Sequence, residues 1–139
     1  MTSRIGTLHV YEGVHTLLRE LHDLGQKLAI VTTSPNMVPD EAIKVYGWPI
    51  DIVIGYHQVT RRKPHPEGLI LAMQKGGAIS SETIHIGDKP ADTQASRAAG
   101  VAAIGAAWGA ADVEALKASE PDFVANTVAD LRSYLLTKL

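Results

Sequence analysis

The stretch Thr83-Ile-His-Ile-Gly-Asp-Lys-Pro-Ala-Asp92 decides how we read this chain. It predicts a short apolar strand that stops at Gly87 and then presents two carboxylates, those of Asp88 and Asp92. A helix is expected to begin at Pro90, because the first turn of a helix does not need that N–H group. Carboxylates at the C-terminal end of a strand suit a hard cation such as Mg²⁺, which prefers oxygen ligands. An Asp-Pro turn that only caps a helix is the alternative for this segment taken alone.

Composition and charge fit a single domain over residues 1–139, in which residues 1–12 form a strand or an extension. The chain is 45% hydrophobic and carries 13 Lys and Arg against 15 Asp and Glu. This balance gives no reason to expect nucleic acid or a membrane as a partner, and no apolar run approaches the length of a bilayer span. The absence of cysteine excludes disulfides and thiolate chemistry and fits a cytoplasmic protein. The six histidines lack metal-ligand spacing, and we expect most of them at the surface or partly buried.

Predicted strands and helices alternate along the chain. Short apolar runs predict strands at 27–32, 51–54, 83–87, 101–104 and 123–124, and residues 5–11 are expected to form another. Helical spacing predicts helices at 14–24, 35–46, 67–75, 90–99, 113–118 and 127–138. Such alternation is typical of an α/β fold with a doubly wound parallel sheet in three layers. No segment is long enough for a substantial cap domain.

Polar residues follow three of these predicted strands. Thr32-Thr-Ser34 ends one strand, Lys63 lies in the loop after the second, and Asp88 with Asp92 follows the third. Since the C-terminal ends of parallel strands meet at one edge of a sheet, we expect these groups to converge. Hydroxyls can hold phosphate oxygens, a lysine can neutralise a phosphoryl group, and a carboxylate can ligate Mg²⁺. Taken singly, each has an ordinary explanation as a helix cap or a solvated loop residue.

Three segments together resemble the motifs of one enzyme family. Leu28-Ala-Ile-Val-Thr-Thr-Ser34 resembles its second motif, Lys63-Pro-His-Pro66 its third, and Gly87-Asp-Lys-Pro-Ala-Asp92 its fourth. In these motifs the sequence is similar to the haloacid dehalogenase (HAD) superfamily, especially its phosphoglycolate-phosphatase-like hydrolases. The resemblance implies a HAD-like Rossmannoid core and a Mg²⁺-dependent phosphomonoester phosphatase acting on a small phosphorylated metabolite.

The resemblance also implies a role for each matching residue. Thr32 and Lys63 become the catalytic candidates: Thr32, with Thr33, would bind the phosphoryl group, and Lys63 would bind and neutralise it. Asp88 would ligate Mg²⁺, and Asp92 would support either Asp88 or Lys63. The resemblance does not name the substrate, because the cap and its neighbouring loops largely select it in this family.

The first motif of the family, Asp-x-Asp-x-Thr, supplies the nucleophile and is not found, since no Asp precedes Asp23. Two alignments stay open. Either Ser3-Arg-Ile-Gly-Thr-Leu8 occupies the place of the motif without its carboxylates, or Met1 lies downstream of the motif, with Tyr11-Glu-Gly-Val14 where the chain returns from a cap. In both cases we expect impaired or absent phosphatase activity and weak Mg²⁺ affinity.

The missing motif also affects the expected sheet. The family's first strand lies between the strands that match residues 28–32 and 83–87, and unpaired inner edges are costly. We therefore expect residues 5–11, or a strand from a homodimer partner or a complementing chain, to fill that place. Two further functions stay open: a non-catalytic relative that binds phosphate or a partner, and one part of a split or truncated phosphatase.

Overall fold

The computed structural model of the chain describes residues 13–32 and 47–139. The helices of the described residues are α1 (Val14–Asp23), α3 (Glu67–Gly76), α4 (Pro90–Ala99), α5 (Val113–Ala118) and α6 (Val128–Leu136). The strands are β1 (Ala29–Val31), β2 (Ile52–Ile54), β3 (Ile84–Gly87), β4 (Ala102–Ala106) and β5 (Phe123–Ala125). Short 3₁₀ turns lie at η2 (Tyr56–Gln58), η3 (Ser80–Glu82) and η4 (Ala107–Gly109). The predicted strand at 5–11 and helix at 35–46 lie outside the described residues.

All strand pairs of the described residues are parallel. β1 pairs with β2, while β3, β4 and β5 form a second sheet in that order. No hydrogen-bonded ladder joins β1 to β3 within the part of the chain that the structure describes. The predicted α/β class with parallel strands is confirmed, and the strand expected between β1 and β3 stays a prediction.

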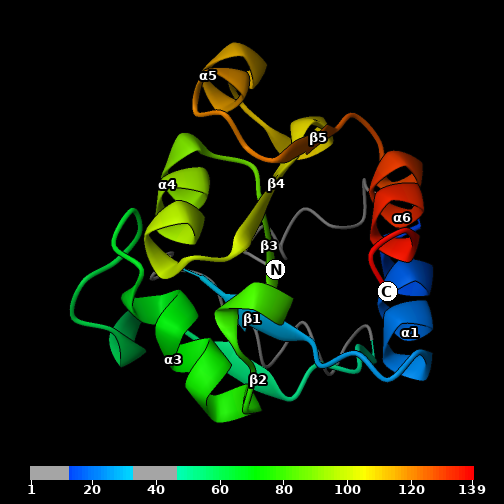
Figure 1. Cartoon of the computed structure of the whole chain (residues 1–139), viewed down its shortest axis with the longest axis horizontal. Helices are drawn as coiled ribbons and strands as arrows, with labels where there is room; N and C mark the ends of the chain where they lie inside the picture. The colour runs from blue at the N-terminus through cyan, green and yellow to red at the C-terminus, as the bar shows by residue number, and fades with distance from the viewer. Residues whose placement is uncertain (1–12, 33–46) are drawn as a thin grey trace.

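Helices cover both faces of the strands, as Figure 1 shows. On one face, α3 and α4 pack against the strands around a buried cluster of Val31, Ile54, Val59, Leu69, Ala95 and Val101. On the other face, α1 and α6 share a cluster of Leu17, Leu21, Ile104, Ala125, Leu131 and Leu135. Burying each large apolar side chain contributes roughly 1.5–3 kcal/mol, so these two clusters hold the helices against the strands.

Two of the differences from the sequence prediction can be traced to packing. β4 runs to Ala106, two residues beyond the expected end, because Gly105 has no side chain and allows Leu116 and Pro121 to pack closely against the strand. Trp108, expected in a loop, lies in η4 and packs partly buried against the α1–α6 cluster. None of the described helices combines the length and apolar character needed to cross a membrane.

Candidate active site

Lys63 lies where the ends of β1 and β3 approach each other. Its Nζ is 2.7 Å from Oδ1 of Asp92, in the first turn of α4, and both side chains are less than a tenth exposed. The same ammonium donates to the carbonyl oxygen of Val31, the last residue of β1, at 3.4 Å. Lys63 therefore connects the β1–β2 sheet to the helix that follows β3.

Asp92 is held by two donors at once. Oδ1 accepts from Lys63, and Oδ2 accepts from the backbone N–H of Lys89 at 3.1 Å. The carboxylate reaches this position because Gly87 has no side chain: a Cβ there would overlap the side chain of Asp92. The glycine of the Gly-Asp segment thus makes room for the second carboxylate five residues later.

Asp88 follows β3 directly and is 8% exposed. Burial lowers the pKa of Lys63, and the carboxylates of Asp92 and Asp88 oppose that shift. Lys63 and Asp92 depend on each other, because removing one partner of a buried ion pair leaves an uncompensated charge at a cost of about 3–5 kcal/mol.

Thr32 is also buried at this edge, with 2% of its surface exposed. Its backbone N–H donates to the carbonyl of Ile54 at 2.9 Å, which extends the β1–β2 pairing by one residue. Thr32 therefore follows immediately after the carbonyl that Lys63 contacts. Thr33 and Ser34, the other hydroxyls predicted here, lie outside the described residues.

The loop that carries Lys63 is fastened by Glu67, a residue that the sequence analysis did not single out. The carboxylate of Glu67 accepts from the backbone N–H groups of Thr60 and Arg61, at 3.0 and 2.8 Å. These two donors lower the pKa of Glu67. His65 Nδ1 accepts from the N–H of Glu67 at 3.1 Å. The sequence contained a signal for this role, because Glu67 is an acidic residue in the first turn of a helix, where backbone N–H groups lack partners.

His85 is an exception to the expectation that most histidines are at the surface or partly buried. It is 3% exposed, and its Nδ1 lies 2.7 Å from Oγ of Ser96 on α4. The sequence contained a signal, because a residue between Ile84 and Ile86 in a strand covered on both faces points into the opposite core.

The predicted Mg²⁺ ligands can be compared with this geometry. Asp88 fits as a single carboxylate ligand, since Mg²⁺ is commonly bound by one or two carboxylates together with water and phosphate. Both oxygens of Asp92 already accept hydrogen bonds, which fits the supporting position predicted for this residue. Residues 13–32 and 47–139 contain no group of three His, Asp or Glu side chains arranged to hold a metal.

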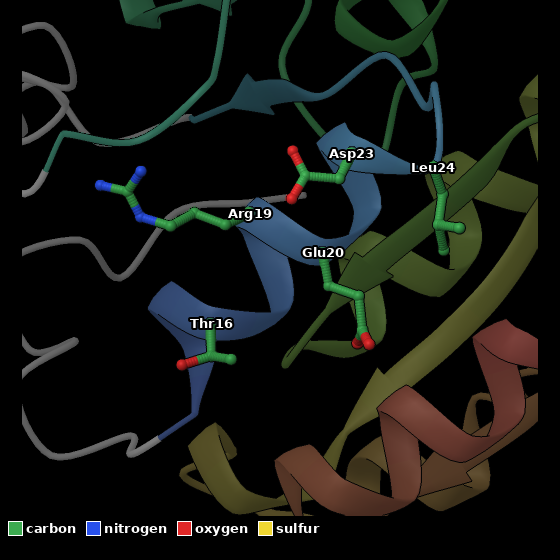
Figure 2. A pocket seen from close by; sticks show the side chains of 5 residues that line it. All are labelled: Thr16, Arg19, Glu20, Asp23 and Leu24. Carbon is green, nitrogen blue, oxygen red and sulfur yellow. The ribbon is translucent and has the colours of Figure 1, made fainter.

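A hollow elsewhere on the surface is less suited to chemistry. It has a volume of about 470 Å³ and is lined by Thr16, Arg19, Glu20, Asp23 and Leu24 of α1 and its end. Figure 2 shows that these side chains spread away from one another, so no polar groups converge on a ligand. Glu20 is bound instead to Arg132 of α6. We therefore place the candidate site at the edge formed by Thr32, Lys63, Asp88 and Asp92.

Comparison with known proteins decides the family. Residues 2–106 match the model of haloacid dehalogenase-like hydrolases. This chain belongs to that family. The resemblance of the HAD-like chain to phosphoglycolate phosphatases, expected from its motifs, is also confirmed. A phosphoglycolate phosphatase of Vibrio vulnificus is 34% identical over 131 residues, which cover 92% of this chain and 57% of that protein.

Other relatives of this HAD-like chain carry different names. The pyrophosphatase PpaX of Listeria welshimeri is 36% identical over 123 residues, covering 87% of this chain and 57% of the relative. A crystal structure described as a predicted phosphoglycolate phosphatase from Haemophilus somnus matches with a TM-score of 0.81 and 25% identity, over 90% of this chain and 56% of that one. The chain thus spans just over half the length of the curated relatives it matches.

Proposed function

We propose that this HAD-like chain supplies the phosphate-binding part of a Mg²⁺-dependent phosphomonoester phosphatase. The observation that carries the proposal is the buried Lys63–Asp92 ion pair, 2.7 Å long, directly beside the end of β1 at Thr32. A buried ammonium at a strand edge can neutralise the charge of a phosphoryl group. The names of the relatives support a small phosphorylated metabolite as the substrate.

Each residue has a role in this proposal. The hydroxyl of Thr32 donates to a phosphoryl oxygen, with Thr33 beside it, and Lys63 neutralises the phosphoryl charge while Asp92 orients its ammonium. Asp88 holds Mg²⁺, which when bound acts as a Lewis acid on a phosphoryl oxygen. We place the protein in the cytoplasm.

The proposal includes low or absent turnover by this chain alone. The sequence has no Asp before Asp23, so the Asp-x-Asp nucleophile of the family has no counterpart ahead of α1. The same observation is compatible with a second candidate, a relative that binds phosphate or a partner without hydrolysis. A split or truncated phosphatase accounts for the same observation, because the strand between β1 and β3 and the nucleophile would then come from another chain or from a further part of the protein.

Thermal unfolding with Mg²⁺ and inorganic phosphate tests the binding proposal. A ligand at 100 times its Kd stabilises the folded state by about 2.7 kcal/mol, which raises the melting temperature. We expect this rise for the wild type and for Thr32→Ser, which keeps the hydroxyl. Thr32→Val removes the hydroxyl at similar volume and should weaken phosphate binding at least about tenfold, the loss of one hydrogen bond to a charged group.

The control and the hydrolysis assay separate the alternatives. Asp51→Asn changes an exposed carboxylate just before β2 and should leave the phosphate-dependent rise intact, whereas Asp88→Asn should reduce its dependence on Mg²⁺. An equal rise in the wild type and Thr32→Val, or no rise in the wild type, would contradict the proposal. Phosphate binding without hydrolysis of a phosphomonoester favours the non-catalytic or split alternative.

A further inference from the structure

A chain of buried polar groups lies behind the carboxylate of Asp92. Ser96, one turn further along α4, is completely buried, and its Oγ donates to the backbone carbonyl of Asp92 at 2.9 Å. The same Oγ is 2.7 Å from Nδ1 of His85 on the neighbouring strand β3. The three residues therefore link the core of β3 to the first turn of α4.

Counting protons fixes the direction of these hydrogen bonds. The carbonyl oxygen of Asp92 can only accept, so the single hydroxyl proton of Ser96 is used there. Nδ1 of His85 must then carry the proton that Ser96 Oγ accepts. Burial holds the pKa of His85 well below 6.5, and the charge of Lys63 lowers it further, so the ring is neutral at pH 7. The neutral ring is thus the Nδ1–H tautomer, with a bare Nε2.

Nε2 of His85 is buried and has no hydrogen-bond partner among residues 13–32 and 47–139. An unpaired buried acceptor is unfavourable, and the strand position between Ile84 and Ile86 would accept an apolar side chain without that cost. Filling the core therefore does not explain why a histidine occupies this position. The ring instead contacts Ser96 through Nδ1, and the backbone of Asp92 is also a hydrogen-bond partner of the ring.

The other side of Asp92 faces the site. Its carboxylate accepts hydrogen bonds from Lys63 and from the N–H of Lys89. Its backbone carbonyl accepts a hydrogen bond from Ser96, so both parts of Asp92 are held in place. Any rotation of the first turn of α4 would change the distance between Asp92 and Lys63. The position of the ammonium thus depends on a contact with β3 that lies outside the site.

We infer that His85 is a positioning residue, which acts through Ser96 to hold Asp92 where it aligns the ammonium of Lys63. The link from His85 to Lys63 rests on geometry alone. Its effect on phosphate affinity rests on the proposed function described above.

Nuclear magnetic resonance of the imidazole nitrogens tests the first step. Two-bond ¹H–¹⁵N spectra of the full chain distinguish the two neutral tautomers of a histidine. We expect His85 as the Nδ1–H tautomer in the wild type and a loss of that preference in Ser96→Ala. Thr93→Val is the matched control, because Thr93 is a buried hydroxyl of the same helix whose Oγ1 instead lies 2.9 Å from Oγ of Ser119. An Nε2–H tautomer in the wild type would overturn the inference.

The ammonium resonance of Lys63 tests the second step, since it is visible only when hydrogen bonds slow exchange with water. We expect the signal in the wild type and in Thr93→Val, and its loss in Ser96→Ala and His85→Leu. His85→Asn keeps a donor at the place of Nδ1 and should restore the signal. Equal signals in His85→Leu and the wild type, or none in the wild type, would overturn the inference. If His85→Leu does not fold, the Lys63 signal of Ser96→Ala is compared with that of the wild type instead.

Titration with inorganic phosphate separates this inference from the proposed function. Ser96→Ala should bind phosphate about three- to tenfold more weakly than Thr93→Val, as expected for one misaligned charged hydrogen bond. If the wild type binds no phosphate, the proposed function fails, while the tautomer and the Lys63 signal still decide the role of His85. Equal phosphate affinity in Ser96→Ala and Thr93→Val, in a wild type that binds, would contradict the link to Lys63.

Discussion

Gly87 shows how one missing side chain shapes the site. Asp92 occupies the space that a Cβ at this position would need. Replacing Gly87 by alanine should therefore displace Asp92 and destabilise the fold by about 1–3 kcal/mol, the usual cost of overpacking a core. Chemical denaturation monitored by circular dichroism measures this loss of unfolding free energy.

Gly55→Ala provides the matched control for Gly87→Ala. Gly55 directly follows β2, whereas Gly87 is the last residue of β3. The φ of Gly55, −97°, suits any residue, and the nearest atom to an added Cβ is Oε1 of the Gln58 side chain at 3.4 Å. We expect a change below about 1 kcal/mol for this variant, since a flexible side chain can move aside. Equal destabilisation by the two substitutions would show that the close approach of Asp92 is not the cause.

The sequence identified residues whose chemistry is visible in their type and spacing. Lys63 and Asp92 were expected to converge, and the structure brings them within 2.7 Å. Their catalytic roles, and those of Thr32 and Asp88, stay predictions. The burial of His85 could have been inferred from its place in a strand. Its hydrogen bond to Ser96 could not, because a contact between two elements depends on packing that no local pattern encodes.

At the scale of elements, the loop from residue 60 to residue 67 is held by the negatively charged carboxylate of Glu67. The N–H groups of Thr60 and Arg61 lower the pKa of Glu67, so the unfolded chain binds the proton more tightly than the folded one. The stabilisation is therefore complete above pH 4.5, the ordinary value for Glu67, and is lost as the pH falls through the lowered pKa of the folded state.

Glu67→Gln tests this dependence. The amide keeps one acceptor but has no negative charge, so the variant should be less stable than the wild type at pH 7. The difference in unfolding free energy should shrink as the pH is lowered below 4.5, which denaturant titrations at several pH values can measure. Glu114→Gln, at an exposed residue of α5, controls for replacing a surface carboxylate. A difference between wild type and Glu67→Gln that does not change with pH would contradict the role of the charge.

Element boundaries were predicted best where local signals agree. α4 runs from Pro90 to Ala99, as expected from a proline at its start and Gly100 after its end. β4 was predicted too short, because the close packing of Leu116 on Gly105 is a contact between distant elements. Trp48, buried in a cluster with Val14 and Ile30, was missed because the segment around it has neither helical nor strand periodicity.

At the scale of the whole molecule, α1 and α6 bring the two ends of the described chain together (Figure 1). Arg132 forms two hydrogen bonds with Glu20, 112 residues away, at 2.7 and 2.8 Å. This ion pair is exposed, and exposed pairs contribute little. The adjacent Leu131 is 1% exposed and belongs to the core cluster that α1 and α6 share. Packing, and not charge, should therefore hold α6 in place.

Two neighbouring substitutions separate packing from charge. Leu131→Ala should reduce the unfolding free energy by about 2–5 kcal/mol, the usual range for a buried leucine. Arg132→Ala should have a much smaller effect that decreases further at high salt. Denaturant unfolding at low and high ionic strength provides the measurement. A larger loss for Arg132→Ala than for Leu131→Ala would reverse this assignment.

The overall α/β architecture was predicted from the sequence. Alternating strands and helices identified the α/β class, because burial on both faces leaves continuous apolar runs such as Leu28–Val31. The described strands form two parallel sheets, and the strand expected to join them, at residues 5–11, lies outside the described residues. The order of strands within a sheet depends on long-range pairing, which a single sequence does not encode. A central strand from residues 5–11 or from another chain stays a prediction.

The bridge that Lys63 makes between Val31 and Asp92 limits how this protein can be engineered. Buried ion pairs are frequent targets for thermostabilisation, because replacing both partners by apolar residues is often neutral or favourable. Here the same exchange would remove the ammonium proposed to meet the phosphoryl group, so greater heat resistance would come at the expense of ligand affinity. Variants designed for heat resistance should instead change exposed apolar residues such as Leu24 and Ile79, which lie outside this bridge.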